Sequence, residues 1–550
     1  MLAAKSTLHY LNSRNIQIGP TSSIFITVRL CSGTKYLCTS LACAQINAAL
    51  GYPLGICQLM VPISPVSTMP VTGKCLEGLV ILACCCAFIL FGYDQGVLSG
   101  LVSTSSFLTE FGNPSPGLLG TIVAIYDVGC AIGSIATIWI GDRLGRRRTI
   151  FIGGILVGIF STRCCSYGGS LICDFRHCVF EVSIPSGKGI DQGSNNKSSW
   201  IDFAFVFGGK VHGSAIWRIP IALQAVFPIM TFIILPFIPE SPRWLAFKGL
   251  DSQVQDCLAR LAGGNARPYD EDIEEKARII INTANSEAEI TDSWLDIFKT
   301  GEQQNLRRMI LGVMTQLIQQ FTCINGVVYY GPAIFSQSLG MDAKLAAIVG
   351  GCGSICFWIG SILPIFFIER LGRRHVMLHG LFMTVIALAG LTVATAFAQY
   401  SAHQRAAGFG ALACLLVYQF CYGASWAGVP WVYAPEINSL RMRNRGSAIA
   451  SAAEWIGAFL VVEVTPSGVA NLTWKYYLIW ILVSVIGYIF IYVCYPETSG
   501  ASLEDMDLYF LEQRSWNILH EKSIKASLLG DYRHSASGDE SKGVPLQHLE

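Results

Sequence analysis

The sequence carries little charge. Asp, Glu, Lys and Arg make up 14% of the 550 residues, and the formal net charge is +1 at pH 7. Because no strong field of one sign surrounds such a chain, we expect no nucleic-acid partner. Cysteine pairs with the CxxC spacing of metal sites, a phosphate-binding glycine loop and a recognisable nucleophile are also missing. The sequence therefore predicts no enzyme, no metal and no bound cofactor.

Hydrophobic residues, in contrast, make up 52% of the chain, and there are 54 glycines. This composition and the positive mean hydropathy are outside the usual range of soluble domains. The 20 cysteines could suggest a disulfide scaffold, but Cys84, Cys85 and Cys86 are consecutive within an apolar run. We expect most cysteines to be small buried side chains of a membrane protein.

Nine stretches approach the roughly 20 apolar residues that a helix needs to cross the bilayer. A shorter run at 149–160 is too brief to cross without the residues that follow it. The sequence predicts an all-α multi-pass membrane protein embedded in the lipid bilayer. The nine stretches are 76–101, 117–140, 219–238, 307–331, 344–368, 376–398, 408–433, 446–465 and 476–495.

Lysine and arginine collect on alternate loops, which marks that side as cytoplasmic. We expect a protein of the cell membrane with both termini inside, provided that the number of crossings is even. The charged stretch 246–305 should form short amphipathic helices on the same side. The predicted parts are an N-terminal extension (1–74), an N-terminal bundle (75–245) with an atypical loop (162–212), this linker (246–305), a C-terminal bundle (306–497) and a polar tail (498–550).

A charged motif occurs twice, as GDRLGRRR at 141–148 and as ERLGRR at 369–374. Each copy follows a predicted span, and this duplication is expected of an internal structural repeat. The arginines alone could anchor the cytoplasmic side, but nearby acids would let them latch the two halves of the bundle in one state, although single surface pairs are weak. The predicted latch comprises Asp142, Arg143, Arg146, Arg147, Glu240, Arg243, Glu369, Arg370, Arg373, Arg374, Glu436 and Arg443.

Three glutamines, Gln316, Gln319 and Gln320, are spaced i, i+3 and i+4 and so share one face of a predicted membrane helix. Amides are costly in lipid unless they face a cavity or bond to a neighbouring helix, and both explanations stay open. Asp94 lies in the first apolar span, where a carboxyl group is a functional candidate by default. Trp431 is either a membrane-interface anchor or an apolar platform with one N–H donor.

Seven motifs together resemble the sugar porters of the major facilitator superfamily, especially fungal hexose and disaccharide transporters. The resemblance implies two six-helix bundles, a central cavity and alternating access. It covers most of 75–160 and 213–510. The motifs are GYDQGVLSG (92–100), GDRLGRRR (141–148), PESPRWL (239–245), QLIQQFTCINGVVYY (316–330), ERLGRR (369–374), VPWVYAPEINSLRMRNRG (429–446) and YPETSG (495–500).

The resemblance also implies roles for individual residues. Gln316, Gln319, Gln320, Asn325 and Trp431 would contact a sugar, because amides both donate and accept hydrogen bonds. Tyr329 and Tyr330 would lie at the outer gate, and Asp94 would couple proton movement to transport. The proton would then be the coupling ion, and a hexose or small oligosaccharide the substrate. The sequence leaves the oligomeric state open.

The resemblance is interrupted between about 161 and 199, which contains no family motif and no run long enough to cross a membrane. The sequence therefore predicts that the N-terminal bundle lacks about two helices. A faulty gene model and a truncated, inactive paralogue would both produce this pattern. A sugar sensor of the same fold that does not transport is a further alternative, although the polar tail after Phe510 is short.

Overall fold

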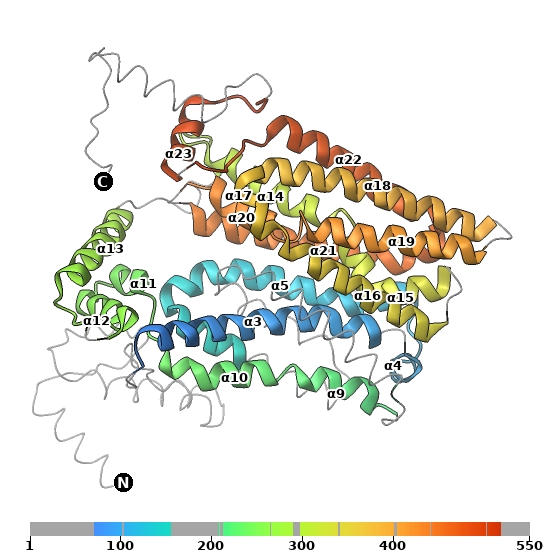
Figure 1. The fold of residues 1–550 in the computed structure, drawn as a ribbon, viewed down its shortest axis with the longest axis horizontal. Coiled ribbons are helices and arrows are strands. Elements are labelled where there is room, and N and C mark those ends of the chain that lie inside the picture. Colours follow the sequence, from blue (N-terminus) through green and yellow to red (C-terminus); the bar gives the residue numbers. More distant parts are fainter. Residues whose placement is uncertain are drawn as a thin grey trace, which may run out of the picture. The chain divides into compact units, whose positions relative to one another are not determined.

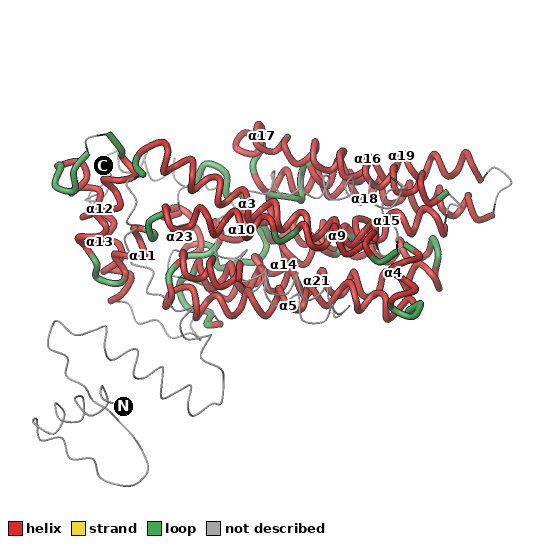
Figure 2. The backbone as a smooth tube through the Cα atoms, turned by 90° about the horizontal axis from the view of Figure 1, so that it is seen from below, coloured by secondary structure: helices red, strands yellow, loops and turns green. Residues whose placement is uncertain are grey.

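The computed structural model describes residues 71–101, 104–155, 208, 213–264, 266–289, 298–338, 342–400, 404–439, 442–501 and 503–518. These residues all belong to one compact unit, Ser64–Glu550 (Figure 1). The structure describes the backbone but not the side chain of some helical residues, including Asp94 and Asp142. Helices and loops account for all of the described chain, and no strand occurs in it (Figure 2). The all-α prediction is therefore confirmed for these residues.

Long apolar helices form the N-terminal half, as the hydropathy predicts. α3 pairs with α10, and a helical segment begins at Arg146 and is described as far as residue 155. The predicted span 219–238 is divided between two helices and a final 3-10 turn, and Pro220 lies inside the first of them. The elements are α3 (Gly73–Leu101), α4 (Ser105–Glu110), α5 (Pro116–Leu144), α9 (Ala215–Leu223), α10 (Val226–Ile234) and η4 (Leu235–Phe237).

Three helices follow the N-terminal half and lie together at one end of the bundle (Figure 1 and Figure 2). They are α11 (Pro242–Phe247), α12 (Asp251–Ala262) and α13 (Glu271–Glu289). Their apolar faces bury one another around Val254, Cys257 and Ala277. Arg260 attaches this group to the bundle, because its guanidinium donates to the carbonyl oxygens of Val71 and Phe237, both at 3.3 Å. Amphipathic helices are thus present where the linker was predicted.

The C-terminal half contains the largest hydrophobic core. Its outer faces expose large apolar side chains such as Phe366 and Leu482, which is expected of helices that face lipid. The helices are α14 (Asn305–Gln320), α15 (Ile324–Ser338), α16 (Ala343–Ile362), α17 (Pro364–Leu371), α18 (Arg373–Tyr400), α19 (Gln404–Gly423), α20 (Val429–Ile437), α21 (Arg443–Leu472), α22 (Lys475–Cys494) and α23 (Leu503–Glu512).

Seven helical stretches of the described chain are long and apolar enough to cross a membrane. Besides 219–238, the predicted span 344–368 is divided into α16 and α17 at Leu363, and two further spans that were predicted as continuous are broken by short non-helical segments. The first, 307–331, divides into α14 and α15 around residues 321–323, and the second, 408–433, divides into α19 and α20 around residues 424–428. Hydropathy does not detect such breaks, because the residues on either side of them are equally apolar.

The last described helix, α23, closes over the first turns of α14. Arg308 is fully buried, pairs with Asp507 and lies 4.3 Å from the centre of the Phe510 ring. The neighbouring Arg307 donates from Nη1 to the carbonyl oxygen of Gln513 at 2.8 Å. Two buried guanidinium groups therefore hold the segment after α22 against the C-terminal half.

The two halves meet along α5 and α21, which pack closely against each other. A Cβ atom on Gly120 would lie 2.6 Å from the carbonyl oxygen of Glu463, so the two backbones approach more closely than side chains would permit. Thr121 donates to the Glu463 carboxylate at 2.8 Å, and the rings of Tyr126 and Trp455 meet edge to face at 5.8 Å. We call this contact the α5–α21 seam.

Candidate functional site

The break between α14 and α15 brings polar groups into the interior of the C-terminal half. Cys323 has a φ of +72°, a conformation that ends a helix, and its N–H donates to the Gln320 carbonyl oxygen at 3.0 Å. The hydroxyl of Tyr418 in α19 donates to the Thr322 carbonyl oxygen at 2.7 Å. A neighbouring helix therefore satisfies backbone that the break leaves unpaired, as membrane interiors require.

The three glutamines lie in the last turns of α14 and are all at least 95% buried. Gln319 donates from Nε2 to the carbonyl oxygen of Trp426 at 2.8 Å, so it connects α14 to the turn between α19 and α20. Gln316 Oε1 is buried and accepts no hydrogen bond from the part of the chain that the structure describes. One glutamine thus forms an interhelical bond, whereas another has an open acceptor in the interior.

Gln320 is the centre of a short hydrogen-bond network that joins three helices. Its Nε2 donates to Oε1 of Glu454 in α21 at 3.3 Å, and its Oε1 accepts from Nδ2 of Asn325 in α15 at 2.9 Å. All three side chains are buried. The predicted polar pair Gln320 and Asn325 is therefore brought together, with a carboxyl group beside it.

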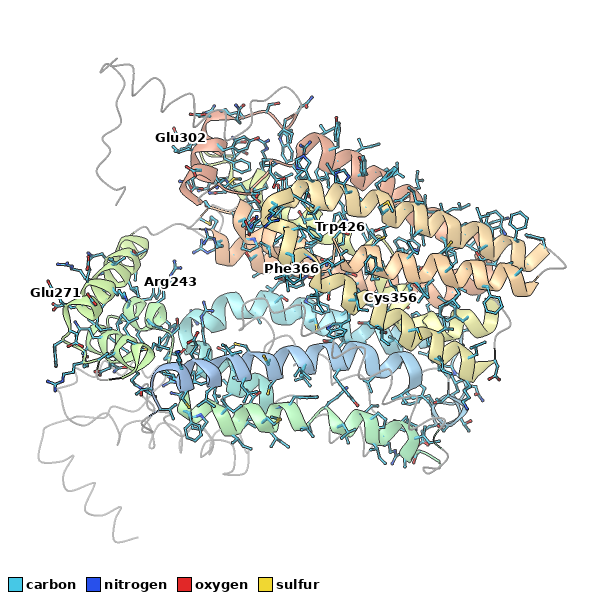
Figure 3. The ribbon with its side chains drawn as sticks, in the orientation of Figure 1. Arg243, Glu271, Glu302, Cys356, Phe366 and Trp426 are labelled. Carbon is cyan, nitrogen blue, oxygen red and sulfur yellow. The ribbon has the colours of Figure 1, made fainter. Side chains whose placement is uncertain are left out.

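Aromatic residues surround this region. Tyr329 and Tyr330 are buried on α15, and Trp431 is half-buried on α20, which packs against α14. Trp426, labelled in Figure 3 among the helices of the C-terminal half, is fully buried and donates from Nε1 to the Met377 carbonyl oxygen at 3.0 Å. Sequence reasoning selected Trp431 and missed Trp426, whose backbone positions Gln319. No local pattern in the sequence distinguishes the two tryptophans.

Two aspartates of the N-terminal half differ in what can be described. Asp94 is part of α3, but its side chain is outside the described part of the structure, so its role in proton coupling stays a prediction. Asp127 on α5 is fully buried. It lies close enough to the hydroxyl of Tyr330 to interact with it electrostatically, as does Glu463. Acids from both halves therefore act electrostatically on Tyr330.

The first charged motif is joined to Glu240 by backbone groups. The N–H of Arg146 donates to Glu240 Oε1 at 2.8 Å, and the N–H of Arg147 lies 3.3 Å from both carboxylate oxygens. Gly145 has a φ of +84°, and a Cβ atom there would lie 2.9 Å from Glu240 Oε2. Glu240 thus caps the helical segment that begins at Arg146.

The second motif repeats this arrangement with Glu497. The N–H groups of Arg373 and Arg374 donate to its two carboxylate oxygens at 2.7 and 3.1 Å, and Gly372 has a φ of +88°. The Arg373 side chain adds a bidentate pair with Glu369, at 2.8 Å for both bonds, and a bond to Glu436 at 3.0 Å. This copy therefore joins α17, α18, α20 and the segment after α22.

The bonds that the structure defines for these two motifs each lie within one half of the molecule. A latch between the halves thus stays a prediction. Glu369 is largely exposed, and the Arg373 guanidinium holds the pKa of its carboxyl group below its ordinary value. Among the other predicted latch residues, Arg143, Arg146, Arg243 and Arg370 are exposed, Arg147 is buried, and Arg443 begins α21.

Comparison with known proteins identifies the family. A family model described as "Sugar (and other) transporter" matches residues 79–170 and 198–510. The MFS-type transporter oryC of Aspergillus oryzae is 33% identical over 471 residues, which cover 80% of this chain and 86% of the relative. The sugar transporter STL1 of Saccharomyces cerevisiae is 27% identical over 520 residues, with 86% and 90% covered. Hexose transporter HXT11 of the same yeast is 30% identical over 472 residues, with 77% and 80% covered.

Solved structures show the same fold. The proton:xylose symporter XylE bound to 6-bromo-6-deoxy-D-glucose superposes with a TM-score of 0.64 at 24% identity, over 79% of this chain and 99% of that chain. The inward-open xylose transporter XylE from E. coli gives a TM-score of 0.60 at 22% identity, over the same two shares.

The family model leaves 171–197 unmatched, inside the segment that the sequence separates from the family. Apart from Gly208, the predicted atypical loop 162–212 lies outside the described residues, so the predicted absence of two helices is not tested. Each of these relatives is described as a transporter or symporter, which supports the prediction of a transporter and not an enzyme. The chain belongs to the sugar transporter family, the sugar porters of the major facilitator superfamily.

Proposed function

We propose that this protein carries a hexose or a small oligosaccharide across the cell membrane together with a proton, by alternating access. The observation that carries the proposal is the buried network of Gln320, Asn325 and Glu454 beside the helix break. It places donors and acceptors that match sugar hydroxyl groups within an apolar bundle.

In this proposal Gln316, Gln320 and Asn325 bind the hydroxyl groups, and Gln319 holds the α19–α20 turn in place while it contributes to the same face. The open acceptor on Gln316 is suited to a donated sugar hydroxyl. Trp431 supplies an apolar surface for the C–H face of the sugar ring. Tyr329 and Tyr330 close the site from the side of α15 that follows the break.

The relatives support the choice of substrate and coupling ion. One relative is named as a hexose transporter, and one solved structure of the same fold is described as a proton:xylose symporter. The positive charge on the loops of the α11–α13 end supports a cytoplasmic location of that end and of both termini.

Sugar uptake by the full chain, expressed in a strain without its own hexose transporters, tests the site. We expect Gln320→Ala and Trp431→Ala each to lower the uptake of labelled glucose at least about tenfold, because each removes a direct contact with the sugar. Gln399→Ala is the matched control, because Gln399 is exposed and bonds only to Thr473 among the contacts described. Unchanged uptake by both site variants would remove these residues from the proposal.

Accumulation against a gradient tests the coupling. Asp94→Asn should abolish accumulation of the sugar while exchange of labelled sugar across the membrane continues, because the variant cannot release a proton there. Accumulation that persists in this variant and still follows the pH gradient would exclude Asp94 from proton coupling.

A further inference from the structure

Glu454 is a carboxyl group in direct contact with the proposed sugar site. It lies near the middle of α21, is 5% exposed and accepts from Nε2 of Gln320 at 3.3 Å. A carboxylate inside a membrane protein is costly, and a neutral glutamine would fill the same space without that cost. An ionisable group at this position is therefore a candidate for a role that a neutral amide cannot fulfil.

The charge on Glu454 fixes the direction of the whole network. An ionised carboxylate only accepts hydrogen bonds, so Gln320 must turn its NH₂ group toward Glu454. The Gln320 oxygen then faces Asn325, which must donate to it, as it does at 2.9 Å. A protonated Glu454 can donate, and this allows the Gln320 amide to turn over and lose its bond with Asn325. Protonation of Glu454 thus changes which donor and acceptor atoms of Gln320 and Asn325 are free to bind a ligand.

Each helix that packs against α21 carries titratable groups of its own. Tyr422 of α19 interacts electrostatically with Glu454. The ring of Tyr126 on α5 packs against Trp455, the residue that follows Glu454 in sequence. Asp127 is the residue after Tyr126 on the same helix. On α14, the charged groups are Arg307 and Arg308 at its far end. The remaining titratable groups on the packed helices are Cys130, Asp142 and Arg143 on α5, Tyr329 and Tyr330 on α15, Tyr433 and Glu436 on α20, Lys475, Tyr476, Tyr477, Tyr488, Tyr492 and Cys494 on α22, and Arg443, Arg445 and Glu463 on α21 itself.

Several of these neighbours have other partners or are neutral at physiological pH. Glu463 accepts from Thr121 across the seam, and Glu436 accepts from Arg373 near the charged motif. Tyr476 bonds to Thr465 at 2.7 Å. Glu454 is the carboxyl group for which the structure defines a bond to a proposed sugar-binding amide, so its protonation acts on the site without an intermediate.

We propose that Glu454 is a proton-binding group of the sugar site, and that its protonation releases Gln320 to bind the substrate. This inference rests on the proposed function of the same site. The ionised group holds the Gln320 amide in a charge-assisted hydrogen bond, which a sugar must displace. The protonated group holds it less strongly, so sugar binds more tightly at low pH. By thermodynamic linkage, sugar binding then takes up protons from the solution.

The test is equilibrium binding to the purified full chain in detergent, with D-glucose, D-xylose and maltose as probes. The wild-type protein should bind its sugar about tenfold more tightly at about pH 5 than at about pH 8. Glu454→Gln is permanently neutral, so its affinity should be constant within about twofold over the same range. Glu454→Asp keeps a titratable group and should restore part of the pH dependence.

Glu463→Gln is the matched control, because it neutralises a carboxyl group of the same helix that bonds to Thr121 instead of to a sugar-site amide. It should keep the pH dependence of the wild-type protein. The inference fails, and the proposed function stands, if Glu454→Gln binds sugar with the wild-type pH profile or if Glu463→Gln loses that profile. Both fail if the wild-type protein binds none of the probes at either pH.

A second measurement does not depend on the sugar. Infrared difference spectra of the protein between the two pH values report carboxyl groups that gain a proton. One protonated-carboxyl band should disappear in Glu454→Gln and persist in Glu463→Gln. If acidification gives the same bands in Glu454→Gln as in the wild-type protein, Glu454 does not bind the proton.

Discussion

The two charged motifs share a backbone arrangement but differ in how their side chains are used. In both copies a glycine with positive φ is followed by two arginines, and their N–H groups donate to a glutamate from a distant Pro-Glu pair, Glu240 or Glu497. In the second copy the Arg373 side chain also binds Glu369 and Glu436. The described bonds of the first copy to Glu240 come from backbone groups.

This difference distinguishes two roles of the motif, helix capping and side-chain ion pairing, which cannot be told apart from the sequence. The repeated element is a carboxylate that caps a helix, which requires glycine and backbone N–H groups and does not require an arginine side chain. The arginine side chain adds a second layer of bonds that joins further helices in the C-terminal half. Substitutions that affect one layer and not the other should therefore act differently in the two copies.

Removal of the capping carboxylate should have the largest effect. Glu497→Ala should destabilise the protein by about 3 kcal/mol and Glu240→Ala by about 2 kcal/mol, because each leaves buried N–H groups without an acceptor. Glu497 additionally accepts from Thr498 N, Ser499 N and His375 Nδ1, whereas Glu240 additionally accepts from Ser241 N. Thermal unfolding in detergent measures both, and an equal or reversed order would contradict the comparison.

Substitution of the glycine tests the close approach of the carboxylate. A Cβ atom on Gly372 would lie 2.5 Å from Cδ and 2.9 Å from Oε1 of Glu497, so Gly372→Ala should cost about 3 kcal/mol. Gly249→Ala is the control, because Gly249 also has a positive φ, +67°, but no atom within 4 Å of such a Cβ. We expect it to cost about 1 kcal/mol. Similar melting temperatures for the two variants would show that crowding at Gly372 is unimportant.

Replacement of the arginine side chains should discriminate between the two copies most clearly. Arg373→Lys cannot form the bidentate pair with Glu369 while it also bonds to Glu436, and it should cost about 1 to 2 kcal/mol. Arg146→Lys keeps the backbone N–H that binds Glu240 and changes only an exposed side chain, so we expect less than about 0.5 kcal/mol. If both variants unfold at the same temperature, the second layer of bonds contributes nothing.

The smallest effect should depend on pH. Because the folded protein holds the pKa of Glu369 below its ordinary value, the ion pair stabilises the protein above the pKa of the unfolded chain and is lost as the pH falls through the lower, folded value. Glu369→Gln should thus cost at most about 0.5 kcal/mol at neutral pH, since the side chain is exposed. The difference from the wild-type protein should begin to shrink as the pH falls below the ordinary glutamate pKa of about 4.3 and should vanish only below the lower, folded pKa. A difference that grows on acidification would contradict this assignment.

The course of the helices could largely be predicted from hydropathy, whereas the breaks could not. Residues 321–323 and 424–428 lie within apolar sequence, and at the first break Tyr418 donates to the Thr322 carbonyl oxygen, next to the positive φ of Cys323. That partner is 96 residues away in the chain. Similarly, the motif repeat predicts two equivalent turns, but the sequence does not reveal that backbone N–H groups bind the carboxylates.

The candidate site could be predicted in part. The i, i+3, i+4 spacing places three glutamines on one face, and all three are buried. Their different partners could not be predicted, because Gln319 bonds to the carbonyl oxygen of Trp426 and Gln320 to Glu454, each more than 100 residues away. Glu454 lies within the predicted span 446–465, but the sequence does not reveal its contact with Gln320, which places it beside the site.

The α5–α21 seam restricts how the two halves can move relative to each other. At Gly120 the backbone of α5 lies against the Glu463 carbonyl oxygen, with no side chain between them. If the halves rock, the contact at Gly120 either separates or serves as the pivot, because at this point no side chain lies between the two backbones that could repack. A pivot here would make the helices farthest from it move the most, and a bulky residue at Gly120 would push α5 and α21 apart at the pivot itself.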